Sequence, residues 1–306
     1  MATMTESLPT LDAESVAARL TEAWALGVVA LERLGGGMNS QTWLVTSDGG
    51  RWVAKIVPEA MATKLAGGLA VAARIEAGGI PAGAPVAARN GELVVNVGAS
   101  GMALLTYVDG DGLTWETEAE LRLIGGTLAR AHRALNGLEI PGADRFHWLE
   151  LGAEHLAIRP WIRPAIENAL AVWEGLPPES LTWGLLHTDP APEAFLLDAA
   201  GTCGLIDWDR ALVGPLMYDV ASAVMYVGGP RFGGALIDAY VAGGGLERSE
   251  IDRSLLPMLR FRWAVQAFYF AERVATNDMT GISDPAENED GLEDARQALA
   301  EIATAT

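Results

Sequence analysis

The first third of the chain alternates short apolar, β-branched runs with polar turns, a pattern that indicates strands. Between the second and third runs, Ser47-Asp48-Gly49-Gly50 has the residues that tight hairpin turns prefer. Five runs predict an antiparallel sheet, at residues 28–34, 41–46, 51–57, 93–97 and 102–108. Apolar residues at helical spacing predict two helices in the same region, at residues 13–26, with Asp12 as the N-cap, and at residues 60–77.

Beyond residue 110 the pattern changes to the longer period of helices. In residues 118–135 Leu121, Ile124 and Leu128 fall on one face, although Gly125-Gly126 interrupts the segment. A glycine inside a helix costs roughly 1 kcal/mol relative to alanine, so we expect close packing against another backbone there. Further helices are predicted at residues 161–174, 217–227, 230–242, 250–276 and 293–303. A small antiparallel sheet followed by helices predicts an α+β fold.

The polar residues that carry chemistry gather around one hairpin in the helical half. Apolar runs at residues 195–197 and 204–206 flank a turn at residues 198–201 and predict its two strands. Asp189 precedes the hairpin and Asp207 follows it, so the pattern leaves both carboxylates in loops. Such a pair suits phosphoryl transfer, in which one carboxylate orients and deprotonates the attacking hydroxyl and the other binds a magnesium ion that bridges the phosphates.

A second candidate cluster lies in the predicted sheet. Residues 34–40 read Leu-Gly-Gly-Gly-Met-Asn-Ser, and consecutive glycines allow backbone N–H groups to turn toward an anion, although glycine triplets are also common in plain hairpin turns. Lys55 lies inside an apolar strand, where an unpaired ammonium group is costly to bury. Its side chain either extends to solvent at a sheet edge or faces an anionic ligand.

Together these segments resemble the aminoglycoside phosphotransferase and choline kinase family, distant relatives of the protein kinases. The resemblance covers nearly the whole chain. It rests on the order of the glycine-rich loop and the strand lysine, followed by His187-Thr188-Asp189, Ile206-Asp207-Trp208, Gly214-Pro215 and Tyr218-Asp219. It implies a bilobal protein-kinase-like fold, with a small lobe at residues 1–109 that holds the antiparallel sheet and a helix, and a larger, mainly helical lobe at residues 110–306.

The resemblance also implies ATP and Mg²⁺ as cofactors and a role for each candidate residue. Asp189 is expected to be the catalytic base and Asp207 the magnesium ligand. Lys55 is expected to hold the α and β phosphates, and the backbone at Tyr107, in the hinge between the lobes, is expected to bind the adenine edge. The loop expected to cover the phosphates contains Gly35, Gly36, Gly37 and Ser40.

Four other residues that could carry chemistry are assigned structural roles. His187 is expected to hold the backbone of the catalytic loop, and Asp219 to cap the following helix and anchor that loop. His132 is expected to pack at a helix end, because no second metal-type residue accompanies it at suitable spacing. Cys203 fits a small buried residue of the hairpin.

The chain departs from the family pattern in the helix after Lys55. In the family this helix carries a glutamate that pairs with the lysine, but the corresponding turns here read Ala66-Gly67-Gly68. Glu76 lies about two turns later. Either Glu76 approaches Lys55 from an unusual position, or phosphate alone holds the lysine.

A second departure lies after the catalytic loop. Five residues beyond Asp189 the family carries an asparagine that binds a second metal ion, and Ala194 stands at this position. The neighbouring Glu193 could supply an oxygen to the metal instead. If Glu193 points to solvent, the protein works with one magnesium ion or is hardly active.

Composition places the chain among soluble globular proteins. Of its 306 residues 50% are hydrophobic and 20% are charged, which is enough for a substantial core. The formal charge of −19 argues against a nucleic-acid partner, because phosphate backbones would be repelled. The sequence lacks an apolar run of about 18 residues and a signal-peptide pattern, which predicts no membrane association and a cytoplasmic location. The single cysteine excludes an internal disulfide.

The first functional hypothesis is an ATP-dependent kinase that transfers the γ-phosphoryl group to a hydroxyl. Through the resemblance, the acceptor is a small molecule of antibiotic, choline, homoserine or sugar type, or a Ser or Thr of a natural-product precursor peptide, which would imply a partner enzyme. The alternative is a catalytically weakened kinase-like module that binds nucleotide or peptide for a partner enzyme, and the two departures favour it. Substrate choice is expected to depend on the helical region at residues 138–178.

Overall fold

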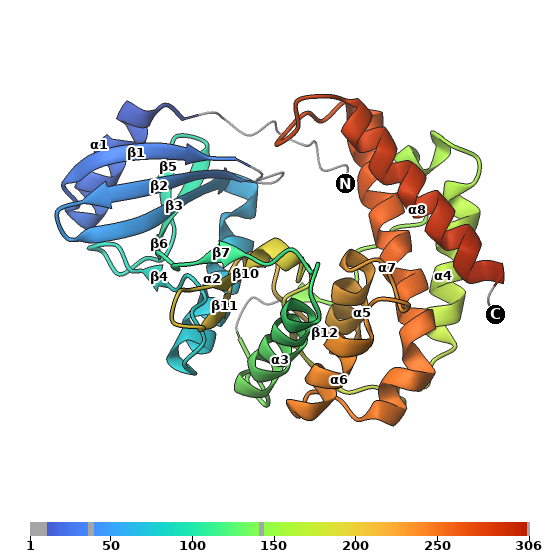
Figure 1. Cartoon of the computed structure of the whole chain (residues 1–306). Helices are drawn as coiled ribbons and strands as arrows, with labels where there is room; N and C mark the ends of the chain where they lie inside the picture. The colour runs from blue at the N-terminus through green and yellow to red at the C-terminus, as the bar shows by residue number, and fades with distance from the viewer. Residues whose placement is uncertain (1–10, 36–39, 141–143, 305–306) are drawn as a thin grey trace.

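The computed structural model describes residues 11–35, 40–140 and 144–304. An antiparallel sheet forms the N-terminal region and helices dominate the C-terminal region, as the pattern predicts (Figure 1). The helices are α1 (Ala13–Trp24), α2 (Ala62–Ala77), α3 (Glu118–Ala134), α4 (Ile162–Glu174), α5 (Met217–Tyr226), α6 (Gly234–Ala242), α7 (Arg248–Thr276) and α8 (Ala286–Thr304). The strands are β1 (Val28–Leu34), β2 (Gln41–Ser47), β3 (Gly50–Pro58), β4 (Pro85–Val86), β5 (Val95–Val97), β6 (Ser100–Thr106), β7 (Asp111–Gly112), β8 (Asp144–Arg145), β9 (Trp183–Leu186), β10 (Phe195–Leu197), β11 (Cys203–Leu205) and β12 (Leu212–Pro215).

The N-terminal sheet has the strand order β1-β2-β3-β6-β4, and β5 also pairs with β6. All of these pairs are antiparallel. The five predicted strands are confirmed, and β4 was missed because two residues are too few for an alternating pattern. In the central strand β3, Lys55 lies opposite Thr42 of β2 and Ala103 of β6. At the start of α1, Asp12 accepts a hydrogen bond from the Ser15 N–H at 2.8 Å, which confirms the predicted N-cap.

The two glycines inside α3 have different surroundings. A Cβ atom on Gly125 would lie 2.0 Å from the carbonyl oxygen of Leu236 in α6. A Cβ atom on Gly126 would meet nothing within 4 Å. The expected close packing against another backbone is therefore confirmed for Gly125 and not for Gly126.

The predicted C-terminal helices are confirmed as α4 to α7, but α8 begins at Ala286, earlier than the predicted residue 293. The sequence between residues 286 and 293 lacks a regular apolar period and therefore predicts a polar loop. Tertiary contacts hold this first part of the helix, since Arg273 of α7 donates to Asn288 Oδ1 at 2.7 Å. Asp284 accepts from the Ala286 N–H at 2.9 Å and satisfies one free donor at the helix start.

The hairpin formed by β10 and β11 packs against the segment that follows the sheet. β10 and β11 pair antiparallel, with Phe195 opposite Leu205, which confirms the predicted hairpin, and Cys203 of β11 is buried as expected. The other edge of β10 pairs with β7. Gly110, at φ +123°, allows this approach, because a Cβ atom there would lie 2.6 Å from the carbonyl group of Leu197. The domain boundary at residue 109 stays a prediction.

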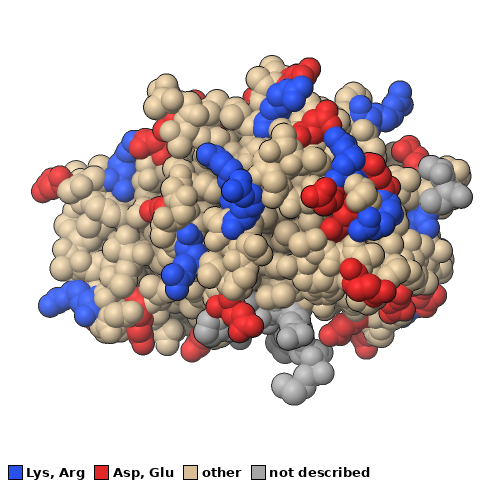
Figure 2. Space-filling model, turned by 90° about the horizontal axis from the view of Figure 1, so that it is seen from below, with Lys and Arg blue, Asp and Glu red and all other residues tan. Residues whose placement is uncertain are grey.

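Charges of both signs occupy the surface. Figure 2 shows Lys and Arg side chains interspersed with Asp and Glu on the face seen from below. One exposed pair, Arg159 with Glu289 at 2.9 Å, links the segment before α4 to α8. Such pairs contribute only about 0–1 kcal/mol each, so the helices are held mainly by apolar packing. Among the helices of the described residues, none has the length and apolar character needed to span a bilayer.

Candidate active site

One imidazole ring connects the two loops that carry the predicted carboxylates. Asp189 lies in the loop after β9, and its backbone N–H donates to His187 Nδ1 at 3.3 Å. On the other side of the ring, His187 Nε2 donates to the carbonyl oxygen of Ile206, the residue before Asp207, at 2.8 Å. The ring is buried and lies 4.7 Å, centroid to centroid, from the indole of Trp208. His187 therefore holds both loops, as its structural assignment predicted.

Asp219 anchors the loop of Asp189 from the first turn of α5. Its fully buried carboxylate accepts from the backbone N–H groups of His187 at 2.6 Å and Thr188 at 2.8 Å. His132 Nε2 of α3 donates to the same carboxylate at 3.0 Å. These bonds hold Thr188 in the left-handed region at φ +78°, which costs free energy for a β-branched residue. The predicted helix cap is wrong, because Asp219 lies inside α5 after the N-cap residue Leu216.

Lys55 is held by two carboxylates of the second loop. The residue is only 7% exposed in the central strand β3, so the alternative of an edge lysine that reaches solvent is wrong. Its Nζ atom contacts Asp207 Oδ1 across 152 residues of sequence, and lies 3.0 Å from Asp209 Oδ2. The fold thus brings the predicted phosphate-binding lysine and the predicted metal ligand into direct contact.

Glu76 is not the partner of Lys55. Its carboxylate accepts from the backbone N–H groups of Ala82 at 3.3 Å and Ala84 at 3.0 Å, and from the Thr106 hydroxyl at 3.1 Å. It therefore ties the turn after α2 to the end of β6. The sequence left two alternatives for Lys55, namely that it pairs with Glu76 or that phosphate alone holds it. Both are wrong, because Lys55 contacts the carboxylate of Asp209.

The packing of α2 against the loop after β11 leaves no room for a side chain at Gly68. A Cβ atom on Gly68 would lie 2.0 Å from the carbonyl oxygen of Trp208 and 2.7 Å from Cα of Asp209. The helix thus lies directly on the backbone of the loop, and no side chain fits at this position. Asp209, on that same loop, supplies the second carboxylate that contacts Lys55.

The three charged groups perturb one another strongly. Burial alone would lower the pKa of Lys55, but the charges of Asp207 and Asp209 outweigh burial and raise it. Burial would raise the pKa of Asp207, yet the charge and hydrogen bond of Lys55 hold it well below its usual range, although 56% of the side chain is exposed. Burial raises the pKa of Asp209, and the charge of Asp207 adds to this effect against the attraction of Lys55. The contact with Lys55 therefore keeps Asp207 ionised, as a metal-binding carboxylate must be.

The side chain of Asp189 is held from two helices that sequence reasoning did not connect to it. Arg262 of α7 donates through Nη2 to Asp189 Oδ1 at 3.0 Å, and the hydroxyl of Tyr226, the last residue of α5, donates to the same oxygen. Burial raises the pKa of the Tyr226 hydroxyl, Arg262 opposes this, and the charge of Asp189 adds to it. Tyr226 therefore keeps its proton and acts as a donor at neutral pH. The side chain of Asp189 remains 53% exposed.

The predicted nucleotide-binding residues are placed only in part. Gly36 and Gly37 lie outside the described residues, whereas Gly35 is described and has open space around it. Ser40 is largely buried, with its hydroxyl 3.5 Å from that of Thr42. Tyr107 follows β6, and the guanidinium of Arg51 lies 4.2 Å from the centre of its ring. The roles of these residues toward ATP stay predictions.

The donor set fits a magnesium ion held mainly by one carboxylate and by the oxygens of a nucleotide. Mg²⁺ is usually bound through one or two carboxylates and substrate phosphates, and the half-exposed Asp207 offers such a carboxylate. Within the ranges that the structure describes, no group of three or more His, Cys, Asp or Glu side chains could form a closed metal site. Glu193 is exposed in the 3-10 helix Pro192–Ala194, and its charge adds to the raised pKa of Tyr226. Its role as a metal ligand stays a prediction.

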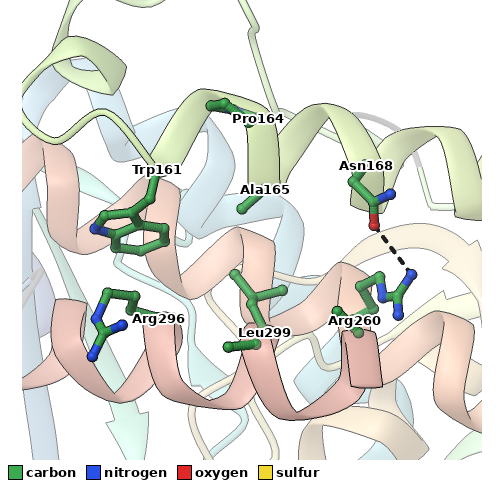
Figure 3. A pocket seen from close by; sticks show the side chains of 9 residues that line it. Trp161, Pro164, Ala165, Asn168, Arg260, Arg296 and Leu299 are labelled. Carbon is green, nitrogen blue, oxygen red and sulfur yellow. Dashed lines mark hydrogen bonds between the residues drawn. The ribbon is translucent and has the colours of Figure 1, made fainter. Parts of the chain in front are cut away.

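A separate pocket of about 550 Å³ lies between α4 and α8 (Figure 3). Arg260 of α7 donates to Asn168 there at 3.1 Å. The pocket contains none of the predicted site residues and no carboxylate. Its lining is formed by Trp161, Pro164, Ala165, Asn168, Arg260, Arg296, Leu299, Ala300 and Ala303. It is therefore not the active site.

Three residues of the site were missed from the sequence, and their signals differ in strength. Asp209 stands two residues after Asp207, directly beyond a strand, which is a usable signal for a second carboxylate. Arg262 lies between Phe261 and Trp263, and a charge inside an aromatic run indicates a buried partner. Tyr226 carries no signal, because a tyrosine near a helix end is unremarkable.

Comparisons with known proteins agree with this geometry. Residues 30–257 match the sequence model described as "Phosphotransferase enzyme family". A homoserine kinase from Phenylobacterium zucineum is 26% identical over 82% of this chain and 82% of its own length. A homoserine kinase from Azorhizobium caulinodans is 30% identical over 60% of this chain and 61% of its own length.

Solved structures with the same fold are more distant in sequence. The amicoumacin kinase hAmiN, in complex with AMP-PNP, Ca²⁺ and Ami, superimposes with a TM-score of 0.75 at 14% identity, over 95% of this chain and 94% of that one. Choline kinase LicA from Streptococcus pneumoniae gives a TM-score of 0.71 at 15% identity, over 94% and 98% of the two chains. At this level of identity the likeness shows the fold, which is the predicted protein-kinase-like one.

Proposed function

The chain belongs to the phosphotransferase enzyme family and is a kinase with an alcohol acceptor, and we propose on this premise that it transfers the γ-phosphoryl group of ATP to the hydroxyl of a homoserine-type amino acid. The observation that carries the proposal is the assembly around His187, whose ring bonds both to the loop of Asp189 and to the residue before Asp207, while Lys55 contacts Asp207. These groups are the ones that phosphoryl transfer requires at one site.

In this proposal each residue has a defined task. Lys55 binds the α and β phosphates, and the loop with Gly35, Gly36, Gly37 and Ser40 covers them. The backbone at Tyr107 binds the adenine edge. Mg²⁺, held by Asp207 with Glu193 as a second candidate ligand, would neutralise charge on the phosphates when bound. Asp189 orients the acceptor hydroxyl and takes its proton as the oxygen attacks the γ-phosphorus.

One observation supports a homoserine-type acceptor over the other classes expected from the resemblance. The relatives aligned above are homoserine kinases, whereas the antibiotic and choline kinases match at 14–15% identity. A peptide Ser or Thr remains a separate acceptor class for the assay to test.

The test is an ADP-release assay with Mg·ATP and a panel of acceptors. The panel contains L-homoserine, 3-aminopropan-1-ol, choline, an aminoglycoside and a short Ser/Thr peptide, with ATP alone as the blank. We expect the highest kcat/KM with L-homoserine, and we expect Asp189→Asn to lower kcat by about 100- to 10,000-fold, to a residual rate that can still be measured, while leaving the Tm shift caused by ATP. Turnover with choline or the peptide but not with homoserine would refute the acceptor class.

The alternative of a weakened binding module is tested in the same experiment. It was motivated by the missing helix glutamate and by Ala194, and the contact of Lys55 with Asp209 removes the first of these reasons. A module would show ATP-dependent stabilisation without ADP release above the blank for any acceptor. A protein that neither binds nor hydrolyses ATP would refute both functions.

A further inference from the structure

The catalytic carboxylate is held asymmetrically. Both donors that reach it, Arg262 Nη2 and the Tyr226 hydroxyl, bind Oδ1. Within the described part of the chain, no hydrogen bond reaches Asp189 Oδ2, and the side chain is half exposed. An oxygen that already accepts two hydrogen bonds, one of them from a cation, is the poorer acceptor for a further proton. The two oxygens are therefore unequal before any substrate arrives.

Arg262 is built into the protein as a rigid support. Its side chain is 4% exposed, and its Nε atom donates to the hydroxyl of the fully buried Ser222 at 3.0 Å. That hydroxyl in turn donates to the Tyr218 carbonyl oxygen at 2.9 Å. The guanidinium also lies 3.1 Å from the Tyr226 hydroxyl, so the two donors of Asp189 are joined to each other. The support connects α5, α7 and the catalytic loop, and it leaves the carboxylate little freedom to rotate.

The charge of Arg262 stabilises the Asp189 carboxylate in its contact with α7. A buried guanidinium without a counter-ion is costly, and Asp189 is the carboxylate that Arg262 contacts. The ion pair holds one carboxylate oxygen, Oδ1, against Arg262 of α7 and leaves the other oxygen without a donor from either helix. The position and the charge of Arg262 thus hold the Asp189 carboxylate with one oxygen bound and the other free of protein donors.

Resting on the proposed function, we propose that Arg262, with Tyr226, is a positioning residue of the reaction: it holds Oδ1 of Asp189 so that Oδ2 faces the acceptor and takes its proton. In the transfer step the acceptor oxygen forms a bond to the γ-phosphorus, and its proton moves to Oδ2. The bond between the γ-phosphorus and the bridging oxygen breaks, and ADP leaves with the electron pair. Arg262 acts through Asp189 and does not contact the reacting atoms.

The test compares Arg262→Met, Arg262→Lys and Tyr226→Phe with the parent, in the presence of Mg·ATP and the best acceptor of the panel. Misplacement of a catalytic group by about 1 Å can cost about 100-fold in rate. We expect Arg262→Met to lower kcat by about this factor, with KM for ATP within about twofold, and Tyr226→Phe and Arg262→Lys to give smaller losses. Removing one partner of an ion pair is costly when the remaining charge is buried, but Asp189 is half exposed and water can solvate its carboxylate, so Arg262→Met should fold.

Arg260 provides a matched control in the same helix. It is also a largely buried arginine, but it bonds to Asn168 at 3.1 Å and to the Ile302 carbonyl oxygen at 3.0 Å instead of to the active site. Arg260→Met should lower Tm and leave kcat within about twofold. A loss of kcat in both variants that follows their loss of stability would mean that Arg262 is merely structural, and would overturn the proposal.

A double-mutant cycle separates positioning from every other role. If Arg262 acts through Asp189, Arg262→Met should cost less than about threefold in the Asp189→Asn background, because residues that act as a unit are not additive. An equal loss in both backgrounds would overturn the proposal, as would a parental kcat in Arg262→Met. A parent without transfer to any acceptor refutes the proposed function and this inference together, whereas an active parent with an additive cycle refutes the inference alone.

Discussion

Gly68 is the position where one added methyl group should disturb the active site most directly. A Cβ atom there would lie 2.0 Å from the carbonyl oxygen of Trp208 and 2.7 Å from Cα of Asp209, and both atoms belong to the backbone. Either α2 or the loop must therefore move in Gly68→Ala. Overpacking of this kind costs about 1–3 kcal/mol, and the preference of a helix interior for alanine offsets only about 0.5–1 kcal/mol. We expect a lower Tm, by roughly 2–4 °C for each kcal/mol.

Two glycines of α3 serve as matched controls for this substitution. Gly125→Ala creates a clash of the same size, 2.0 Å from the Leu236 carbonyl oxygen, but against α6 and not against the catalytic loop. Gly126→Ala creates no clash and should raise stability by about 0.5–1 kcal/mol. All three residues lie inside helices, so the differences between the variants report on the surroundings of each Cβ atom.

Kinetics separate the two clashing variants. Movement of the loop in Gly68→Ala displaces Asp209 and Asp207 relative to Lys55, and a loss of about 1 kcal/mol in nucleotide binding would raise KM for ATP about fivefold. Gly125→Ala should keep the parental KM at temperatures well below its Tm. The reasoning is refuted if Gly68→Ala is as stable as Gly126→Ala, or if it is destabilised with an unchanged KM for ATP.

Three further predictions concern single polar groups. Asp209→Asn removes one of the two negative charges on Lys55 while keeping its shape, and should lower kcat/KM for ATP about tenfold; a parental value would show that Asp209 is not a working counter-ion. Glu76→Gln weakens two backbone hydrogen bonds, and should cost about 1–2 kcal/mol of stability with KM for ATP unchanged. A raised KM for ATP would instead indicate that Glu76 pairs with Lys55. Stability against urea should fall as the pH rises above about 10. Burial raises the pKa of the Tyr240 hydroxyl. Burial alone would lower the pKa of Lys55, but its two carboxylates outweigh this effect and raise it. The folded state then keeps protons that the unfolded chain releases, so a flat profile of urea midpoints between about pH 8 and about pH 11 would contradict this.

Most of the fold could be predicted because its elements bury one face at a regular period. The helix at residues 118–135 shows this, since Ile124 and Leu128 are fully buried in α3 as their spacing indicates. The start of α8 could not be predicted, because contacts such as that between Arg273 and Asn288 hold it in place of an apolar stripe. Periodicity reports burial along one element and carries no information about such cross-helix bonds.

The site could be predicted where its residues fall in motifs and not where partners meet through the fold. Asp189, Asp207 and Lys55 were found from loop position and from a charge inside an apolar strand. The partner Asp209 of Lys55 could not be predicted, because only the packing of the sheet against the loop after β11 brings the two residues together. Arg262 is 73 residues from Asp189, and only the packing of α7 against the catalytic loop brings them together.

Gly68 and Asp209 belong to one structural arrangement around Lys55. Here Gly68 lets α2 lie on the loop backbone, and the counter-ion of Lys55 comes from the loop itself, two residues after Asp207. Lysine, counter-ion and the proposed metal ligand are thus held by one strand and one loop. A displacement of α2 would therefore move both carboxylates together, and it would not separate Lys55 from a helix residue as it would in a kinase whose counter-ion lies on the helix.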